Sequence, residues 1–333
     1  MYSVIDTGTT NTRIYIVKDT GEIVAKAYRK VGVRDTAISG SKKALVDGIV
    51  ACFHDALANG GLREDDINLI FVSGMLTSEL GLIDLPHICA PAGIDELVEQ
   101  CVITNNTDIL PFDIPIAFIR GIKNNTPATY DGLISMDFMR GEETQVVGVL
   151  RKLKPQMPCF IIFLSSHTKI ISVDETGHIT NSMTTMSGQI FEAIKKETFI
   201  GKSVAGGDEQ KSTHKTDILK AVYRSVNDNG LLRTLMMPRF MEVLMESQSQ
   251  DRAFCLDAAI ACDDMKTLAG LLKSAANSQV IFIGHENRCL LYQQLFEMCG
   301  LDVPVQCIFD KQEIDTLTVS GAVSLIEKIV QHK

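Results

Sequence analysis

The sequence predicts an α/β protein with two lobes. Its 333 residues exceed what one hydrophobic core of ordinary size accommodates, so two domains or two lobes of one fold are expected. The order of the predicted elements agrees, because a strand-rich block followed by helices occurs twice and a helix ends the chain. This order is not the alternating pattern of a doubly wound fold, and neither GxGxxG nor GxxxxGK followed by Ser or Thr occurs in the sequence.

The first block opens with an antiparallel meander. Apolar segments separated by turn residues predict its three strands, at 2–5, 12–17 and 23–28. A helix is then predicted over 42–58 by apolar residues on one stripe, Leu45, Ile49, Phe53 and Leu57. A strand over 67–73 follows this helix.

The second block begins near residue 131. Short apolar segments predict its strands, at 133–136, 159–164, 170–173, 280–283 and 303–308. Segments with helical character predict its helices, at 141–150, 188–198, 216–226, 231–245, 253–262, 265–276, 288–299 and 319–331. This block is therefore richer in helices than the first.

The bulk composition excludes several classes of partner. Apolar residues make up 45% and charged residues 22%, which is ordinary for a globular protein. The net charge of −9 argues against a nucleic-acid surface. No apolar run is long enough to span a membrane, and the opening segment lacks the basic stretch of a signal peptide. We therefore expect a small-molecule partner, with no nucleic acid and no membrane.

Nine cysteines are scattered along the chain without a CxxC pair. Their odd number and their positions in apolar segments predict reduced thiols in a cytoplasmic protein, not a disulfide framework or a zinc site. The sequence leaves the oligomeric state open, with a homodimer as one alternative.

The turn between the first two predicted strands is a candidate phosphate site. Its tip offers backbone N–H groups and hydroxyls that can wrap a polyphosphate, in Gly8, Thr9, Thr10 and Asn11. Asp6, which precedes this tip, can hold a water molecule of a hydrated Mg²⁺ ion. The alternative interpretation is an ordinary β-turn made of common turn-forming residues.

Six segments in consistent order resemble the motifs of a known enzyme family. VIDTGTTNTR, residues 4–13, resembles the first phosphate motif of the actin/hexokinase/sugar-kinase superfamily. The other five are similar to motifs of the 2-dehydro-3-deoxygalactonokinases within it: SGMLTSELGL at 73–82, CAPAG at 89–93, MRGEETQ at 139–145, SSHTKII at 165–171 and TTMSGQIFEAI at 184–194. MRGEETQ is the most specific of these segments.

The resemblance implies a fold and an activity. The implied fold has two ribonuclease-H-like lobes of the actin-like ATPase type with a cleft between them. The first lobe would cover 1–126 and the second 127–333, with the last helix near the hinge. The implied activity is an ATP-dependent and Mg²⁺-dependent kinase that phosphorylates the 6-hydroxyl of 2-dehydro-3-deoxy-D-galactonate.

The heptapeptide would supply the catalytic carboxylate. Glu142 and Glu143 begin a predicted helix, and adjacent helical residues lie about 100° apart, so the spacing does not choose between them. Related sugar kinases carry their base at the position that matches Glu142. Without the resemblance, both residues are explained as first-turn glutamates that compensate the helix dipole.

Other site residues follow from the same resemblance. Arg140 would bind the carboxylate of a 2-keto acid, because its planar fork suits carboxylates. Arg13 is a second candidate for this role, or it braces the phosphate hairpin. Met75, Thr77 and Ser78 would line the sugar side, although hydroxyls after a strand often only satisfy backbone groups.

The second half of the chain would hold the rest of the nucleotide. His167, Thr168 and Lys169 match the second phosphate loop, with Thr168 as a phosphate donor and Lys169 neutralising developing charge. A single histidine in such a turn is more often structural. Gly284 and Glu286 match the segment near adenosine, where His285 replaces a small residue.

Several positions depart from the family pattern. Ser166 replaces a glycine, and Leu82 and Ile170 replace tryptophans. Asp257 and Ala261 replace small or glycine residues. The alternatives are therefore a kinase for another sugar or sugar acid, a phosphatase of the same fold, or a non-catalytic sugar sensor.

Overall fold

A computed structural model describes residues 1–208, 211–272 and 278–331. It confirms the α/β class. The contacts divide the chain into two compact units, the first made of Met1–Met157, Ser172–Met183 and Lys311–Lys333 and the second of Pro158–Ile171 and Thr184–Asp310. The expected lobes, 1–126 and 127–333, stay a prediction, because they were assigned from fold resemblance and not from contacts.

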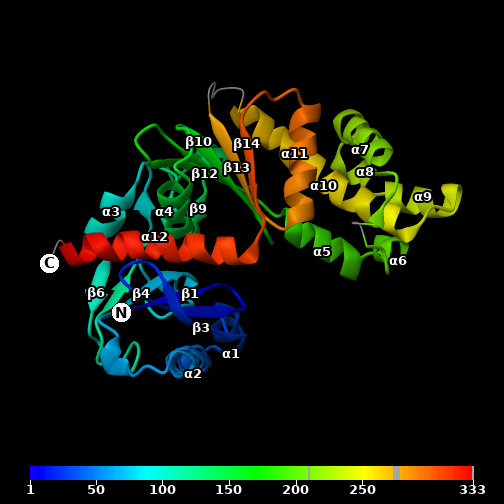
Figure 1. Cartoon of the computed structure of the whole chain (residues 1–333). Helices are drawn as coiled ribbons and strands as arrows, with labels where there is room; N and C mark the ends of the chain where they lie inside the picture. The colour runs from blue at the N-terminus through cyan, green and yellow to red at the C-terminus, as the bar shows by residue number, and fades with distance from the viewer. Residues whose placement is uncertain (209–210, 273–277, 332–333) are drawn as a thin grey trace. The chain divides into compact units, whose positions relative to one another are not determined.

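A six-stranded sheet forms the centre of the first unit (Figure 1). Its spatial order is β3 (Ile23–Arg29), β2 (Thr12–Val17), β1 (Tyr2–Thr7), β4 (Leu69–Gly74), β7 (Ile116–Phe118) and β6 (Val102–Thr104). The first three strands pair antiparallel, which confirms the predicted meander. β4 pairs parallel to β1 and every one of its residues is buried, as expected for a central parallel strand.

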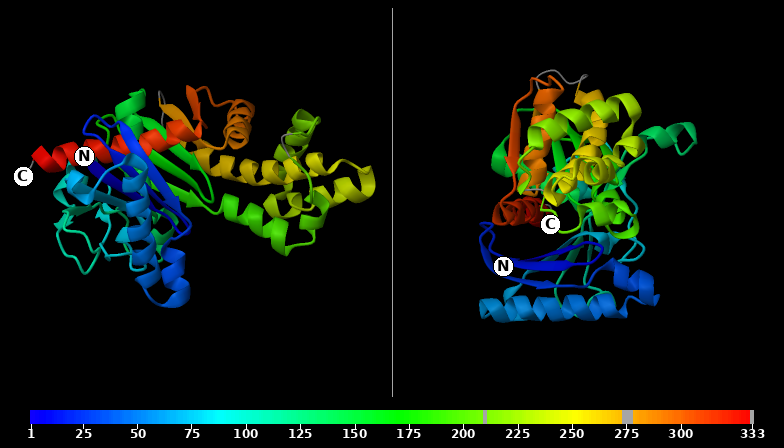
Figure 2. Two further views of the ribbon diagram at one scale, coloured as in Figure 1. Left: turned by 60° about the horizontal axis from the view of Figure 1, so that its bottom comes forward. Right: turned by 90° about the vertical axis from the view of Figure 1, so that its right-hand side faces the viewer.

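Helices and short elements complete the first unit. The helices are α1 (Val33–Ser39), α2 (Lys43–Gly60), α3 (Ile94–Glu99), α4 (Glu142–Leu153) and α12 (Lys311–Gln331). Three 3₁₀ turns occur at η1 (Glu64–Asp66), η2 (Met75–Thr77) and η3 (Asp131–Ser135). A small sheet joins β5 (Ile88–Cys89), β8 (Ile122–Lys123) and β9 (Phe138–Met139). The right panel of Figure 2 shows α2, in blue, lying beneath the strands of the meander.

Helices α4 and α12 pack at very short range because each carries a glycine at the crossing (Figure 1). An ideal Cβ on Gly148 would lie 1.9 Å from the carbonyl oxygen of Leu317, and one on Gly321 would lie 1.8 Å from that of Thr144. No side chain fits at either position. This contact fixes the beginning of α4, which carries the predicted catalytic heptapeptide.

A second sheet has the order β12 (Ile179–Thr185), β11 (Thr168–Val173), β10 (Cys159–Leu164), β13 (Gln279–Gly284) and β14 (Val305–Ile308). β10, β13 and β14 run parallel to one another. β10 is buried along its whole length, which explains its continuous apolar sequence.

Seven helices are described in the second unit: α5 (Ser187–Glu197), α6 (Ile200–Val204), α7 (Lys215–Asn229), α8 (Leu231–Thr234), α9 (Met237–Met245), α10 (Ser249–Leu272) and α11 (Glu286–Met298). The long helix α10 contacts each of the other six (Figures 1 and 2). Its apolar residues Leu256 and Ile260 pack in a small core with Ile200 and Val204 of α6. α10 therefore organises the helical part of this unit.

Three predictions of secondary structure are wrong. Segment 133–136 is not a strand, because it lies mostly in the exposed 3₁₀ turn η3. The helix predicted over 231–245 is two helices, and Pro238 lies in the first turn of the second, where its missing N–H costs nothing. The helices predicted at 253–262 and 265–276 are one continuous helix as far as Leu272, and the remainder lies outside the described residues.

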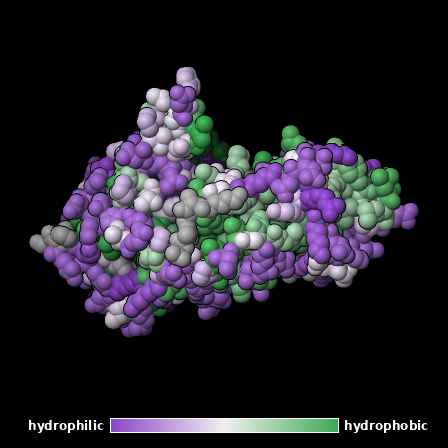
Figure 3. Space-filling model, turned by 90° about the horizontal axis from the view of Figure 1, so that it is seen from above, coloured by the Kyte–Doolittle hydropathy of each residue, from purple (hydrophilic) through white to green (hydrophobic). Residues whose placement is uncertain are grey.

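Figure 3 shows one face of the molecule, on which hydrophilic residues predominate. Apolar colour gathers at the right-hand end, over α9, where Val243, Leu244 and Met245 are more than half exposed. Among the described helices, none has the length and apolar character that crossing a bilayer requires.

The close contact of α4 with α12 predicts that a side chain at the crossing destabilises the protein. Gly321→Ala should lower the free energy of unfolding by about 1–3 kcal/mol or more, because the new methyl group meets backbone that cannot move cheaply. Thermal or urea unfolding measures the loss. Gly270→Ala is the matched control, because Gly270 is also helical and no atom of the described part of the chain, its own helix backbone aside, lies within 4 Å of its Cβ position. A gain of up to about 1 kcal/mol is expected there. Equal effects of the two substitutions would contradict the packing argument.

Candidate active site

The β1–β2 hairpin presents the first group of predicted residues. The N–H of Gly8 donates to the carbonyl oxygen of Asn11 at 2.9 Å, and the hydroxyls of Thr7 and Thr12 lie 3.0 Å apart. Apart from its two chain neighbours, no atom of the described residues lies within 4 Å of a Cβ built on Gly8. The backbone at this tip is therefore open to a ligand, as the phosphate interpretation requires.

The beginning of α1 holds this tip in place, which the sequence analysis did not anticipate. The N–H of Arg34 donates to the carbonyl oxygen of Thr9 at 2.9 Å. A Cβ on Gly32 would lie 2.5 Å from the same oxygen, so only glycine fits there. The carbonyl oxygen of Thr9 is thus already hydrogen-bonded within the protein. Thr9 is exposed, and Thr10 and Asn11 are half-buried.

Asp6 pairs with Arg13 across the hairpin, a contact that agrees with the second of the two roles considered for that arginine. Nη1 of Arg13 lies 3.2 Å from Oδ2 of Asp6. Burial raises the pKa of Asp6, Arg13 lowers it, and the nearby carboxylate of Asp315 raises it, with a net upward direction. Arg13 therefore stabilises the charged form of a carboxylate that its surroundings otherwise disfavour.

The end of β4 and the beginning of α4 meet beside this hairpin. Gly74 has a φ of +79°, and a Cβ there would lie 2.7 Å from the carbonyl oxygen of Thr7 and 3.5 Å from Oδ1 of Asp6. Gly141 has a φ of +108°, and its Cβ would lie 3.3 Å from the Cα of Gly74. Three segments that are distant in the sequence therefore converge within the first unit, two of them through glycines.

Arg140 is held beside this convergence. Its Nη1 donates to Oγ1 of Thr77 at 2.8 Å and its Nη2 donates to the carbonyl oxygen of Leu85. Burial lowers the pKa of Arg140, and the carboxylates of Glu143 and Asp84 oppose this effect. The guanidinium is therefore fixed in orientation by the residues around η2.

The two hydroxyls after β4 are engaged locally. Thr77 is fully buried, and its Oγ1 donates to the carbonyl oxygen of Gly74 at 3.2 Å. Oγ of Ser78 donates to the carbonyl oxygen of Met75 at 2.7 Å. These bonds agree with the alternative in which the hydroxyls satisfy backbone groups, although Thr77 also orients Arg140.

Glu142 and Glu143 have different environments. Glu143 is fully buried, and both of its carboxylate oxygens accept from the N–H of Gly141 at 2.8 Å. Burial, followed by the neighbouring Glu142, raises the pKa of Glu143 to about 8. Glu142 is only half-buried, and its Oε2 accepts from the N–H of Arg140 at 3.2 Å. Glu143 therefore accepts a hydrogen bond from the backbone at the start of α4, whereas the side chain of Glu142 is accessible to solvent.

The predicted second phosphate loop comprises the turn of residues 165–167, between β10 and β11, and the first two residues of β11, Thr168 and Lys169, which were expected in the turn. Within it, the N–H of Ser165 donates to the carbonyl oxygen of His167 at 3.1 Å, and Oγ of Ser166 lies 3.2 Å from Nδ1 of His167. The hydrogen bond to Ser166 agrees with a structural role for the histidine. Thr168 and Lys169 are buried, at 1% and 7% exposure.

Helix α5 closes on this turn, and the β13–α11 junction lies at the same edge of the sheet. A Cβ on Gly188 would lie 2.3 Å from the carbonyl oxygen of Ser165. Gly284, the last residue of β13, is paired with Leu164, the last residue of β10. Glu286 begins α11 with an exposed side chain. The residues predicted near phosphate and near adenosine therefore come together at the ends of parallel strands.

Two of the departures from the family pattern are core residues. Leu82 packs in the core of the first unit at 8% exposure, and Ile170 is 1% exposed on β11. Ser166 is exposed in its turn. Only the last of these departures can alter the surface that meets a ligand directly.

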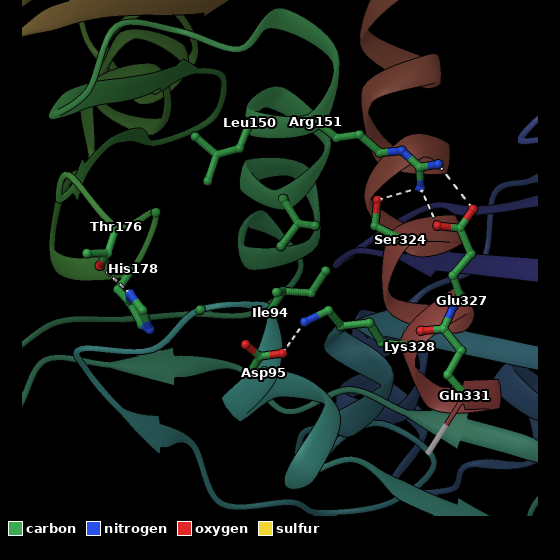
Figure 4. Close-up of a pocket in the computed structure, with 13 residues that line it drawn as sticks. Ile94, Asp95, Leu150, Arg151, Thr176, His178, Ser324, Glu327, Lys328 and Gln331 are labelled. Atoms are coloured by element: carbon green, nitrogen blue, oxygen red, sulfur yellow. Dashed lines mark hydrogen bonds and ion pairs between the residues drawn. The ribbon is translucent and has the colours of Figure 1, made fainter. Parts of the chain in front are cut away.

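A separate pocket of about 660 Å³ lies between α3, α4, α12 and the turn that precedes β12 (Figure 4). None of the predicted site residues lines it. Its charged groups are paired with each other: Arg151 bonds to Glu327 and Ser324, and Lys328 bonds to Asp95. This pocket is therefore separate from the residues that the sequence predicts for the site.

The family model described as "2-keto-3-deoxy-galactonokinase" matches residues 6–318. A protein of Rhizobium meliloti (strain 1021), named "Probable 2-dehydro-3-deoxygalactonokinase DgoK1", is 25% identical over 306 residues, which cover 91% of this chain and 90% of that protein.

Solved structures agree. The crystal structure assigned to a 2-dehydro-3-deoxygalactonokinase protein from Sinorhizobium meliloti superposes with a TM-score of 0.76 and 21% identity over 99% of both chains. Component A of (R)-2-hydroxyglutaryl-CoA dehydratase from Acidaminococcus fermentans gives a TM-score of 0.52 at 15% identity, over 99% of this chain and 98% of that chain. The fold is the actin-like ATPase fold. The chain belongs to the 2-keto-3-deoxy-galactonokinase family, a family of sugar kinases that transfer a phosphoryl group to an alcohol.

Proposed function

We propose that the protein transfers the γ-phosphoryl group of ATP to the 6-hydroxyl of 2-dehydro-3-deoxy-D-galactonate. The O6–P bond forms, the bond from the γ-phosphorus to the β,γ-bridging oxygen breaks, and the products are ADP and 2-dehydro-3-deoxy-6-phosphogalactonate. The observation that carries the proposal is the convergence of Asp6, Arg140 and Glu142 on the ends of β1 and β4 in one compact unit. Family membership supports the reaction class.

Glu142 is the proposed general base, which accepts the proton of the 6-hydroxyl as that oxygen attacks. It is the accessible member of the pair, and the bond from the N–H of Arg140 orients its carboxylate. Glu143 is a poor candidate, because it is fully buried and both its oxygens are used by Gly141. A carboxylate in reach of the hydroxyl proton is what phosphoryl transfer to an alcohol needs.

Arg140 is proposed to bind the carboxylate of the sugar acid. A guanidinium has five N–H donors, and among the described residues its bonds to Thr77 and Leu85 use two of them. Those bonds fix its plane before the substrate arrives, which lowers the entropy cost of binding. Met75 and Ser78 are proposed to line the same side.

Contacts with ATP are proposed for three groups of residues. The hairpin residues Gly8 to Asn11 and the segment from His167 to Lys169 are proposed to contact phosphates, and Gly284 and Glu286 to lie near adenosine. The open space beside Gly8 fits a polyphosphate. An activator of 2-hydroxyisocaproyl-CoA dehydratase from Clostridium difficile, of similar fold at a TM-score of 0.50 and 13% identity over 99% of this chain and 96% of that chain, holds ADPNP.

Mg²⁺ is the proposed metal, with Asp6 as the residue that would hold it through water. The ion would supply charge neutralisation on the phosphates. Arg13, which pairs with Asp6, opposes the rise of the Asp6 pKa that burial causes and so favours the carboxylate form. A cytoplasmic location is also part of the proposal, in keeping with nine cysteines that are all free thiols in the structure.

Glu142→Gln should reduce kcat by about 10²–10⁴-fold while ATP and sugar acid still bind, because only proton transfer is lost. A coupled ADP-release assay with 2-dehydro-3-deoxygalactonate, its gluconate epimer and a panel of sugar acids measures this. Glu99→Gln, at an exposed position of α3, is the control and should leave kcat unchanged. A variant that keeps full turnover would exclude Glu142 as the base, and turnover only with another sugar acid would correct the substrate.

Arg140→Lys should raise KM for the sugar acid by roughly 10–100-fold, because the planar fork and its charge-assisted bonds are lost. The KM for ATP should change little. Arg120→Lys, in the same unit and bonded to the carbonyl oxygen of Gln100, is the matched control. If KM for ATP rises instead, Arg140 serves the nucleotide and the proposed carboxylate contact is wrong.

Glu143→Gln should alter how stability depends on pH. The folded pKa of about 8 lies above the ordinary value of about 4.3, so the folded state binds this proton more tightly than the unfolded state. The wild-type protein therefore loses stability as pH rises between these values, by at most about 1.4 kcal/mol per pH unit from this group. The glutamine variant, which cannot ionise, should gain Tm relative to wild type as pH rises from 5 to 8. A pH-independent difference in Tm would contradict the assignment.

A further inference from the structure

A buried polar network lies next to residues 165–169 in the second unit, which form the turn between β10 and β11 and the beginning of β11. We refer to this segment as the phosphate turn. The centre of the network is Asp264 on α10, at 6% exposure. The carboxylate accepts three O–H donors: Thr185 at 2.7 Å, Ser187 at 2.5 Å and Tyr292 at 2.5 Å. A buried carboxylate is costly unless it is hydrogen-bonded, and these three donors provide that compensation.

A buried ion pair extends the network. Nη1 of Arg288 lies 2.5 Å from Oδ1 of Asp257, and Nη2 of Arg288 donates to the phenol oxygen of Tyr292 at 3.2 Å. Burial lowers the pKa of Arg288, but the neighbouring Asp257 and Tyr292 raise it by more than burial lowers it. The guanidinium therefore stays charged. Asp257, one of the departures from the family pattern, is therefore accounted for by an ion pair with Arg288.

The directions of these bonds decide what Thr168 does. The phenol of Tyr292 has one hydrogen, which it donates to Asp264. Its oxygen then only accepts, from Arg288 and from the hydroxyl of Thr168, which lies 3.4 Å away. The hydrogen of the Thr168 hydroxyl is thus directed into the protein. Thr168 is also 1% exposed.

The same network fixes the other side of the turn. Ser187, the first residue of α5, precedes Gly188, whose missing side chain lets α5 pack against the carbonyl oxygen of Ser165. The N–H of Gln189 donates to the carbonyl oxygen of Ser166 at 2.9 Å. Asp264 therefore connects to the turn twice, through Tyr292 to Thr168 and through Ser187 to Ser166.

We propose that Asp264 and Tyr292 are positioning residues for the phosphate turn, and that the Thr168 hydroxyl anchors this turn to Tyr292 instead of binding phosphate. The inference rests on the proposed function, because it takes the turn to be a phosphate site. The turn then meets the nucleotide through groups other than this hydroxyl. Thr168 differs in this respect from the role that its motif suggests.

A double-mutant cycle of Tyr292→Phe and Thr168→Val tests the proposal in the full-length protein. Each substitution removes one hydroxyl, and the ring of Tyr292 keeps its contact with Phe282, at 5.8 Å between centroids. Thr168→Val, which removes one buried hydrogen bond, should raise KM for ATP roughly five- to tenfold. Tyr292→Phe, which also removes the bonds to Asp264 and Arg288, should raise it at least as much. In both variants KM for the sugar acid and kcat should stay within about twofold of wild type. The double variant should be no worse than Tyr292→Phe alone, because that substitution already removes the bond to Thr168.

Further variants separate positioning from simple loss of stability. Thr168→Ser keeps the hydroxyl and should retain the wild-type KM for ATP. Tyr223→Phe is the matched control, since it removes a hydroxyl that lies 3.6 Å from Sγ of Cys299 in the same unit and should change no kinetic constant. Thermal melts confirm that the variants compared are folded, and if Thr168→Val does not fold, Tyr292→Phe and Thr168→Ser carry the test.

Three results would overturn the proposal. Effects of Tyr292→Phe and Thr168→Val that multiply, or a fall in kcat with Thr168→Val alone, would show that Thr168 acts on phosphate directly. An unchanged KM for ATP in Tyr292→Phe would show that the network does not position the turn. Calorimetric titration of the wild-type protein with ATP–Mg²⁺ is done first. Absence of binding there would refute the proposed function itself, whereas binding with unchanged variants refutes only this inference.

Discussion

The proposed chemistry of the first unit depends on a contact between two glycines. Gly74 ends β4 and Gly141 precedes α4, and the Cβ that any other residue would add to Gly141 would lie 3.3 Å from the Cα of Gly74. Both have positive φ, which residues with a side chain rarely adopt. Because these backbones touch, Asp6 at the end of β1, Arg140 and Glu142 come within one small region. The position of α4 is set in turn by Gly148 and its packing against α12.

The local parts of this arrangement could be predicted from the sequence, and the long-range parts could not. Strands β1 to β3 were predicted correctly because they are consecutive in the sequence and short segments of turn-forming residues separate them. β12 was missed because its sequence, ITNSMTT, is mostly polar and only two of its residues are buried. The contact of Gly74 with Gly141 joins residues 67 positions apart in the sequence, and no periodicity reports it.

The prediction of two helices, where α10 is continuous, has a physical cause. Two helices were expected on either side of residues 263–264, where two aspartates interrupt an apolar pattern. The helix continues, and Asp264 is buried in it. A carboxylate at a core position contradicts the pattern only until its three hydroxyl donors are known, and these come from elements that lie 28 to 79 residues away. In the sequence, the only sign of this network is an acidic residue inside an otherwise apolar helix. Asp257 is a second residue of this kind.

The two glutamates of the heptapeptide differ in burial, and burial raises the pKa of the Glu143 carboxyl group. With a pKa of about 8, Glu143 is mostly neutral at pH 7, so it adds little negative charge beside Glu142. The proposed substrates are a sugar acid and a polyphosphate, both anions, and a fully ionised pair of glutamates would repel them. Arg140 and Arg13 supply positive charge in the same region, each held by a bond to a neighbouring side chain. A region with several carboxyl groups can therefore still receive anionic ligands, because one carboxyl group is neutralised by burial and another is paired.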